Sequence, residues 1–359
     1  MNTKPISRNI SRTKDLPIGL RPRVFVGLSG GVDSAVSAAL LKEQGYDVTG
    51  VFIRAWQPEW LSCTWREERR DAMKICLTLG IPFLFLDAEA EYKKDVVDKM
   101  IAEYKAGRTP NPDVLCNKEI KFGVFWNKAK ELGADFIATG HYLSGEKDQS
   151  YFLWMLTPDD FSHTIFPVGH MEKSEVRKLA KKYNLPVAEK KDSQGICFMG
   201  NVSMEEFLSH YVKAKRGKVM NTEGAVIGRH DGLPYYTVGE RKGFEVTQKG
   251  ADNGPFYIVA KDADTNTLVV SDEESEILEF SPRKIILKNV NWIREPESPE
   301  LTGQVRYRGE KLPIRLSVVG RRLSVEFKTP VRGLSLGQSL VFYENGNLLG
   351  GGIMDKIIS

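Results

Sequence analysis

The sequence has few cysteines, no long apolar run and no strong excess of one charge. Four cysteines among 359 residues are too few for a disulfide scaffold and are typical of a reducing compartment. No apolar stretch approaches the roughly 20 residues that cross a bilayer, and no signal-peptide core follows Met1. We therefore expect a cytoplasmic protein without membrane contact, and the length suggests two or three domains.

Basic residues are concentrated at the amino terminus. The formal net charge is only +4, and residues 1–23 hold six basic residues but a single acid, Asp15. A nucleic-acid-binding surface elsewhere would therefore consist of local basic patches. We assign residues 1–21 to a basic, disordered tail. Because the segment is acid-poor and contains serines, an organellar transit peptide is the alternative.

Apolar strands and amphipathic helices alternate through the first 200 residues or so. Short β-branched runs predict strands over 24–28, 48–53, 82–86 and 136–139. Helical periodicity predicts helices over 35–44, 67–79, 92–105 and 121–132, with glycines ending the first two. This alternation predicts an α/β fold with a doubly wound, mostly parallel sheet, which we assign to a catalytic domain over 22–200.

The pattern changes to short strands with Gly, Asn and Asp turns in the second half of the chain. After a helix over 205–212, strands are predicted over 257–260, 267–271, 305–307, 314–319, 323–327 and 340–343. The segment 344–347 lies between two apolar runs and predicts a hairpin turn. We expect a small connecting domain over 201–280 and a C-terminal β-barrel over 281–359.

A loop rich in glycine and serine joins the first predicted strand to the first helix. It reads Gly27-Leu28-Ser29-Gly30-Gly31-Val32-Asp33-Ser34. Its backbone N–H groups and the helix N-terminus suit an anion. Asp33 would repel a bare phosphate, so we expect it to hold the loop or a Mg²⁺ ion. The loop lacks the lysine of a Walker A motif, and the second strand ends in Arg54-Ala55 without the acid of a dinucleotide fold.

The segment Ser29–Ser34 resembles the pyrophosphate loop of the ATP-pyrophosphatase superfamily. Members of that superfamily have an adenine nucleotide alpha-hydrolase-like fold and use ATP to adenylate an oxygen, releasing pyrophosphate. The resemblance implies ATP, with Mg²⁺, as the cofactor. By itself it leaves amide synthesis, NAD synthesis and tRNA thiolation open.

Four further segments resemble one family, the bacterial tRNA-specific 2-thiouridylases. They are Ala106–Lys118, Ala138–Tyr142, Lys147–Tyr151 and Asp192–Phe198. The resemblance runs from about residue 22 to the end of the chain. It implies ATP-dependent 2-thiolation of the wobble uridine of tRNA and a barrel that contacts tRNA. It also implies a sulfur-donor protein, either a cysteine desulfurase or a sulfur relay, as partner. We expect a monomer.

Replacing a carbonyl oxygen with sulfur needs an activated oxygen and a sulfur nucleophile. Adenylation makes the oxygen a leaving group, a cysteine persulfide brings the sulfur, and a second thiol breaks the remaining S–S bond. By the resemblance, Cys197 carries the persulfide, Cys116 is the partner nucleophile and Asp113 is a catalytic acid or base. We expect both cysteines on loops, with Lys118 favouring the Cys116 thiolate.

The other two cysteines are expected to be structural. Cys76 lies in an amphipathic helix and fits a small buried hydrophobe. Cys63 lies in a Trp-rich loop, where a packing or surface position is favoured.

The remaining site assignments come from the resemblance alone. The ATP-binding positions are Gly27, Leu28, Ser29, Gly30, Gly31, Val32, Asp33, Ser34, Ile53 and Gly140. The tRNA-binding positions are Asn111, Pro112 and Asp113 at the target base, together with His141, Lys147, Asp148, Gln149, Arg306, Tyr307 and Gln338. No residue is assigned as a metal ligand. The target uridine must leave its stack to reach such a pocket.

Three departures from the family pattern affect these assignments. Residues 55–60 replace an acidic, Asn-containing stretch, only four residues separate Tyr142 from Lys147, and Glu240 replaces a glutamine. Other interpretations stay open: an ATP-dependent amidotransferase, a catalytically idle RNA-binding protein, and an iron–sulfur-dependent RNA thiolase with Asp113, Cys116 and Cys197 as cluster ligands.

Overall fold

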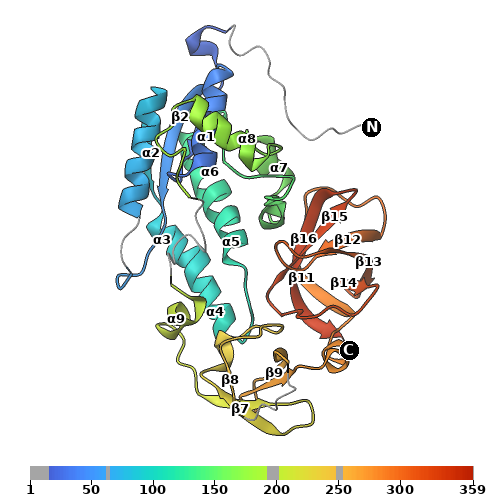
Figure 1. Ribbon diagram of the computed structural model, residues 1–359. Helices are drawn as coiled ribbons and strands as arrows, with labels where there is room; N and C mark the ends of the chain where they lie inside the picture. Colours follow the sequence, from blue (N-terminus) through green and yellow to red (C-terminus); the bar gives the residue numbers. More distant parts are fainter. Residues whose placement is uncertain (1–15, 62–64, 192–201, 248–253, 359) are drawn as a thin grey trace. The chain divides into compact units, whose positions relative to one another are not determined.

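The computed structural model describes residues 16–61, 65–191, 202–247 and 254–358 (Figure 1). Two compact units make up the chain. One comprises the described residues within 1–96 and 113–201, and the other comprises 97–112 and those within 202–359. The predicted boundaries at 22, 201 and 281 stay predictions, and the grouping of 97–112 with the C-terminal unit was not expected. Most of the predicted basic tail lies outside the described residues; Ile18–Leu20 forms one 3-10 turn, η2.

A parallel five-stranded sheet lies at the centre of the first unit. Its order is β3-β2-β1-β4-β5, and every neighbouring pair is parallel. The strands are β1 (Arg23–Gly27), β2 (Asp47–Arg54), β3 (Phe83–Asp87), β4 (Phe136–Ala138) and β5 (Thr164–Ile165). The first four match the predicted strands to within one residue at each end. The predicted α/β class with a parallel sheet is therefore confirmed.

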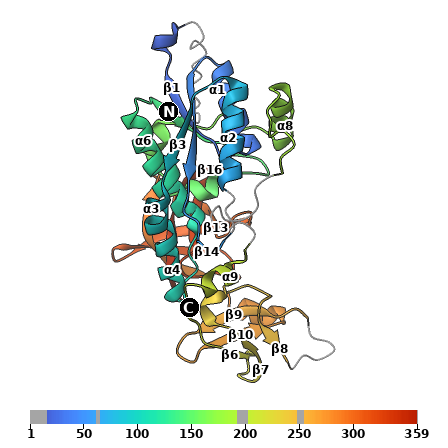
Figure 2. The same ribbon diagram turned by 90° about the vertical axis from the view of Figure 1, so that its left-hand side faces the viewer.

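Helices cover both faces of this sheet. Figure 2 shows α1 (Val32–Glu43) and α2 (Trp65–Leu79) on one side of it and α6 (Phe125–Glu131) on the other. The other helices of the unit are α3 (Glu89–Tyr92), α5 (Pro112–Leu115), α7 (Pro158–Ser162), α8 (Lys173–Lys182), the 3-10 turn η5 (Ser150–Leu153) and the π-helical segments η3 (Lys93–Val97) and η4 (Cys116–Val124). The predicted helix over 92–105 is thus three elements, since α4 (Asp98–Lys105) follows η3.

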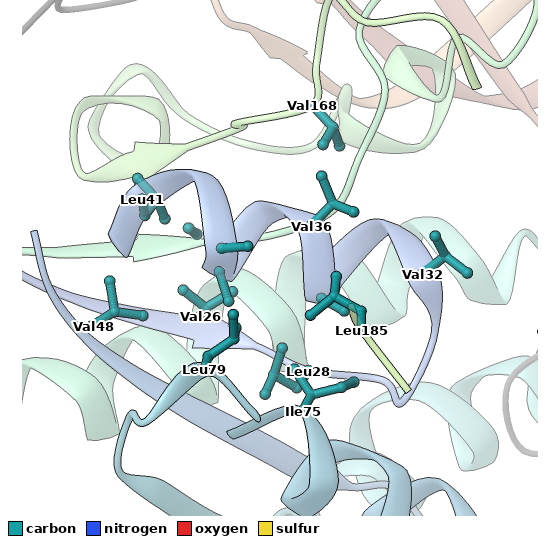
Figure 3. Packing of buried hydrophobic residues seen from close by; sticks show 14 of the residues in the cluster. Val26, Leu28, Val32, Val36, Leu41, Val48, Ile75, Leu79, Val168 and Leu185 are labelled. Atoms are coloured by element: carbon teal, nitrogen blue, oxygen red, sulfur yellow. The ribbon is translucent and has the colours of Figure 1, made fainter. Parts of the chain in front are cut away.

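The first face buries helix α1. This helix follows the Gly- and Ser-rich loop over residues 27–34, which is predicted to bind phosphate and is called the phosphate loop below. Val36 and Leu41 of α1 pack with Val26 of β1, Ile75 of α2 and Leu185, which follows α8 (Figure 3). Each such fully buried aliphatic side chain contributes roughly 1.5–3 kcal/mol relative to exposure. The start of α1 is therefore held firmly against β1, which gives the phosphate loop a rigid support.

The order of the strands creates a switch point between β1 and β4. The chain runs outward from β1 to β2 and β3 on one side, whereas β4 and β5 lie on the other side of β1. Ligands of open α/β sheets bind at such a point, beyond the carboxyl ends of the strands. The loop after β1, beginning at Leu28, and the loop after β4, which contains Gly140, both begin there.

The second unit contains a mixed sheet and a closed barrel. The sheet has the order β8-β7-β6-β10-β9, and the barrel has the order β11-β14-β13-β12-β15-β16 (Figure 1). The sheet strands are β6 (Gly217–Met220), β7 (Val226–His230), β8 (Glu245–Val246), β9 (Tyr257–Asp262) and β10 (Thr267–Ser271). The barrel strands are β11 (Lys284–Trp292), β12 (Glu300–Gln304), β13 (Lys311–Val319), β14 (Arg322–Phe327), β15 (Ser339–Glu344) and β16 (Asn347–Ile358). The helices are α4, α9 (Met204–Ser209), α10 (Glu274–Glu279) and the 3-10 turn η6 (Leu233–Tyr235).

The predicted C-terminal barrel is confirmed, but one of its strands was misplaced. Residues 305–307 are not a strand; they lie in the turn between β12 and β13. Arg308 adopts a positive φ of 61°, and the N–H of Gly309 bonds to the carbonyl of Arg306. A tight turn thus occupies a segment whose Val and Tyr residues favour a strand.

Candidate active site

The phosphate loop is shaped by its own hydroxyl groups and by one glycine. The Ser29 N–H donates to Ser34 Oγ over 3.3 Å, and that hydroxyl donates to the Gly31 carbonyl over 3.3 Å. Gly30 has a φ of +71°, and a Cβ there would lie 2.6 Å from the Glu68 carbonyl oxygen. Gly30 therefore permits both the left-handed turn and the close approach of α2.

The loops after β1 and β4 touch each other. A Cβ on Gly140 would lie 2.8 Å from the backbone nitrogen of Ser34 and 2.9 Å from the carbonyl carbon of Asp33. Of the other predicted ATP-binding residues, Leu28 and Val32 are buried, Ile53 is half-buried and Gly27 faces the ring of Phe125. The structure therefore brings the predicted ATP-binding positions together around the switch point.

Asp33 is held by two side chains that come from distant parts of the sequence. Lys173, at the start of α8, places its Nζ 2.7 and 2.9 Å from the two carboxylate oxygens. The Tyr142 hydroxyl donates to the same carboxylate over 2.6 Å. The Lys173 ammonium also lies 5.9 Å from the centre of the Tyr142 ring. The expectation that Asp33 holds the loop fits these contacts.

A second lysine holds the other end of the loop. Lys190 donates to the Gly30 carbonyl over 3.0 Å and to Asp71 over 2.8 Å. Burial acts to raise the pKa of Asp71, but the hydrogen bond and the charge of Lys190, together with Lys74, outweigh it and lower that pKa. Lys190 thus links the loop to α2.

Cys116 lies in a helix, which corrects the expectation of a loop. Pro112 is the first residue of α5, the position at which proline favours a helix, and the helix continues through η4 into α6. The thiol is buried, with 5% of the residue exposed. Asp113 lies one helical turn before Cys116, and Tyr92 forms a hydrogen bond with the Cys116 thiol.

The charged groups around Cys116 oppose one another. Burial raises the pKa of the Cys116 thiol; the positive charge of Lys121 lowers it and the negative charge of Asp113 raises it. Burial also raises the pKa of Asp113, against the charge of Lys121. Lys118, the lysine predicted to favour the thiolate, instead pairs with Asp160 over 2.9 Å. Lys121 is therefore the lysine that acts on Cys116, because η4 has i to i+5 geometry and carries it back toward residue 116.

His141 is an internal residue of the first unit. Only 9% of it is exposed, and its Nδ1 lies 2.8 Å from Thr139 Oγ1. Its ring lies among Phe122 and Phe166. Burial, aided by the charge of Lys121, lowers its pKa well below the usual value, so the imidazole is neutral. Its predicted contact with tRNA stays a prediction.

The other residues predicted to bind tRNA are distributed over both units. In the first unit, Gln149 Oε1 accepts the N–H of Tyr142, and Asp148 accepts the N–H of Ser150; Lys147 is half-buried. In the second unit, Arg306 donates to the carbonyls of Val238 and Gly333, over 2.8 and 2.6 Å. Asn111, Tyr307 and Gln338 are half-buried there, and Pro112 is buried.

Two of the four cysteines fall outside the described residues. They are Cys63 and Cys197, so the approach of Cys197 to Cys116 stays a prediction. Cys76 is 2% exposed within the apolar core, which confirms that it is a buried structural residue. Burial raises the pKa of its thiol to about 11.

The lysines at the site were not found from the sequence. Lys173, Lys190 and Lys121 each act on a residue of the predicted site, and the first two do so across 140 and 160 positions of the chain. Lys121 had a local signal, since it follows Cys116 by five residues. That spacing points toward Cys116 only when the helix is a π-helix.

Three family models match the chain in succession. Residues 22–201 match the model described as tRNA methyl transferase HUP domain. Residues 205–272 match the tRNA methyl transferase PRC-barrel domain, and residues 282–354 match the aminomethyltransferase beta-barrel domain.

Individual relatives extend over nearly the whole chain. The tRNA-specific 2-thiouridylase MnmA of Enterococcus faecalis is 41% identical, covering 94% of this chain and 96% of the relative. That of Bacillus subtilis is 44% identical, covering 93% and 95%. A solved U34-tRNA thiolase from Methanococcus maripaludis is a distant likeness, with 22% identity, a TM-score of 0.36 and coverage of 56% of this chain and 67% of its own.

Proposed function

Because the chain belongs to the tRNA-specific 2-thiouridylase family, we propose that it replaces the O2 oxygen of the wobble uridine of tRNA with sulfur, at the expense of ATP. The observation that carries this proposal is the buried Cys116 thiol, with half-buried Asp113 one helical turn before it, in the same unit as the phosphate loop. A loop that can cradle phosphates and a thiol beside a carboxyl group are two of the parts that this chemistry needs; the third is the cysteine that carries the persulfide.

The first step is adenylation of the uridine. The O2 oxygen attacks the α-phosphorus of ATP and the uridine loses its N3 proton. The bond from the α-phosphorus to the bridging oxygen breaks, and pyrophosphate leaves with that electron pair. We assign the amides and hydroxyls of Ser29–Ser34, at the N-terminus of α1, to holding the departing phosphates.

The second step delivers sulfur. The terminal sulfur of a persulfide on Cys197 attacks C2, and AMP leaves with the oxygen. The Cys116 thiolate then attacks the Cys197 sulfur, which breaks the S–S bond to the base and leaves 2-thiouridine. The two cysteines end as a disulfide, so a thiol reductant must restore them, and a sulfur-donor protein must reload Cys197.

The surroundings of Cys116 suit a thiol that reacts late. Burial, together with the charge of Asp113, raises the pKa of the Cys116 thiol and keeps it protonated; the charge of Lys121 opposes this rise without cancelling it. Asp113, whose own pKa is raised by burial, is placed one turn away to accept the thiol proton. This arrangement protects the resolving thiol until the base is in place.

ATP use follows from the family, and we propose that Mg²⁺ accompanies it. The described residues contain no group of three or more His, Cys, Asp or Glu side chains placed to hold a metal. Asp33, at the loop, is the carboxylate that would contact Mg²⁺, with the remaining ligands coming from phosphate oxygens and water, as is usual for this ion. The ion would neutralise phosphate charge; the residues of this chain bind and orient the nucleotide.

Two other reactions are less well supported by the site. The family-model descriptions name methyl transfer, which requires neither an ATP-type phosphate loop nor a resolving thiol. An amidotransferase would use the loop but leave Cys116 without a role.

No helix among the described residues is long and apolar enough to cross a membrane. Separately, we propose that the enzyme acts in the cytoplasm.

The test is the nucleoside content of tRNA. We expect cells lacking this protein to lose 2-thiouridine from bulk tRNA by mass spectrometry, and the wild-type gene to restore it. Cys116→Ser should fail to restore it, whereas Cys76→Ala, a change at a packing cysteine, should succeed. Unchanged 2-thiouridine, or loss of a methylated nucleoside instead, would contradict the proposal.

A further inference from the structure

We propose that Lys173 binds the departing pyrophosphate of ATP and takes the place of the lysine that the phosphate loop lacks. This inference rests on the proposed function and assigns a further binding residue to the adenylation step. No Lys or Arg occurs between Gly27 and Ser34. The loop can therefore offer phosphate its amides and hydroxyls, but its one charged side chain is a carboxylate.

The structure supplies a cation to that carboxylate from α8. The Lys173 Nζ lies 2.7 and 2.9 Å from the two oxygens of Asp33, and 17% of the lysine side chain is exposed. Asp33 lies in the first turn of α1, so the Lys173 ammonium, which contacts the Asp33 carboxylate, lies near the N-terminus of that helix. Lysine acts as a flexible point charge and is a common phosphate ligand.

The contacts around Asp33 allow the ammonium to change partner. The Tyr142 hydroxyl also donates to Asp33, over 2.6 Å, and keeps the carboxylate oriented if the lysine turns away. The Tyr142 ring lies 5.9 Å from the Lys173 Nζ and favours a cation beside it with either partner. A positive ion that arrives with ATP can replace the lysine as the counter-charge of Asp33.

The charge of Lys173 stabilises pyrophosphate most strongly as it departs. Breaking the α–β phosphate link adds negative charge to the leaving group, and a preplaced cation stabilises that charge without reorganisation. Lys190 is less suited to this role, since it already holds the Gly30 carbonyl and Asp71. Lys173, in contrast, contacts the carboxylate of the loop, Asp33, and we therefore assign the binding of pyrophosphate to Lys173.

The experiment compares nucleotides that carry and lack the outer phosphates. Binding of ATP, pyrophosphate and AMP to the full-length chain is measured by calorimetry, in the presence of Mg²⁺. We expect Lys173→Met to weaken ATP and pyrophosphate binding roughly 10- to 100-fold, with AMP affinity within about twofold. Lys178→Met removes an exposed lysine from the same helix and should change none of the three. Lys173→Arg should restore part of the lost affinity.

A double variant separates phosphate binding from simple neutralisation of Asp33. If Lys173 only offsets that carboxylate, Asp33→Asn combined with Lys173→Met will bind pyrophosphate as Asp33→Asn alone does, which would overturn the proposal. An equal loss of affinity for ATP and for AMP in Lys173→Met would also overturn the proposal, because that pattern indicates a general structural role. Lys173→Gln replaces the Met variant if the latter does not fold. A wild-type chain that binds no ATP would contradict the proposed function itself.

Discussion

Lys118 and Lys121 lie three residues apart on one helix but act on different groups. The Lys118 ammonium lies 2.9 Å from Asp160, whose carboxylate also caps α7 at Thr157. The charge of Lys121 instead acts on Cys116, Asp113 and His141. The π-helical geometry of η4 separates the two lysines, leaving one to stabilise the fold and one to tune the thiol.

We expect Lys121→Met to shift the reactivity of Cys116 to higher pH. A positive charge favours the thiolate, so removing it raises the thiol pKa, by about one unit for a nearby charge. The measurement is the rate of Cys116 alkylation against pH, followed by peptide mass spectrometry. Lys118→Met is the matched control and should leave the profile in place while lowering stability. Equal shifts in both variants would show that the effect is not specific to Lys121.

Gly140→Ala should impair ATP binding. Its methyl group would lie 2.8 and 2.9 Å from backbone atoms of Ser34 and Asp33, which no change of side-chain rotamer relieves. Displacing the loop should cost about 1–3 kcal/mol of unfolding free energy and weaken ATP affinity. Thermal unfolding and calorimetry measure the two effects. Gly19→Ala, where no atom lies within 4 Å of the added carbon, should be neutral; a neutral Gly140→Ala would mean that the loops separate easily.

Arg306 tests whether a predicted tRNA contact also has a structural role. Its guanidinium donates to the backbone carbonyls of Val238 and Gly333. Arg306→Met leaves both carbonyls without that donor, which should lower the free energy of unfolding by about 1.5–3 kcal/mol. Arg306→Lys keeps the charge but loses the geometry. We expect both variants to melt earlier. If the charge also meets a phosphate, only the Met variant should reduce the slope of log affinity against log salt, by about 0.9. An unchanged slope in both would restrict Arg306 to its structural role.

The roles of the two predicted catalytic cysteines are separable by mass. After treatment with a persulfide donor, Cys116→Ser should gain one sulfur atom, because Cys197 remains to accept it. Cys197→Ser should gain none at the site, since a hydroxyl does not form a persulfide. Intact-mass spectrometry with peptide mapping checks both. The reverse pattern would mean that the assignments of the two thiols are exchanged.

The parts of the site that were predictable are local in sequence. A β-branched run, two glycines and a helix follow one another at the phosphate loop, and each has its own signal, so β1 was expected to within one residue at each end. The helix was expected from residue 35, whereas α1 begins three residues earlier, at Val32, within the predicted loop. The helix around Cys116 was missed because Asn111-Pro112-Asp113 also fits a turn. Proline at a first helical position gives the same local pattern.

The parts that were not predictable depend on tertiary contacts. Nothing near Lys173 or Lys190 indicates that these side chains reach the loop, because the folding of α8 and the segment after it brings them there. Similarly, the turn at residues 305–307 contains Val and Tyr, and its conformation depends on the positive φ of Arg308 and on Arg306 bonding elsewhere in its unit.

The division of the chain at Val96 and Asp113 limits how this enzyme can be dissected. Residues 97–112 belong with the C-terminal unit, where α4 contacts η6, Arg108 pairs with Asp355, and the Thr109 N–H bonds to the Leu336 carbonyl. A gene fragment that stops near residue 201 would therefore retain this segment and discard its partners. Exchanging halves between homologues at that single junction would pair α4 with a foreign surface, whereas a chimera that moves 97–112 together with the C-terminal half keeps these contacts intact.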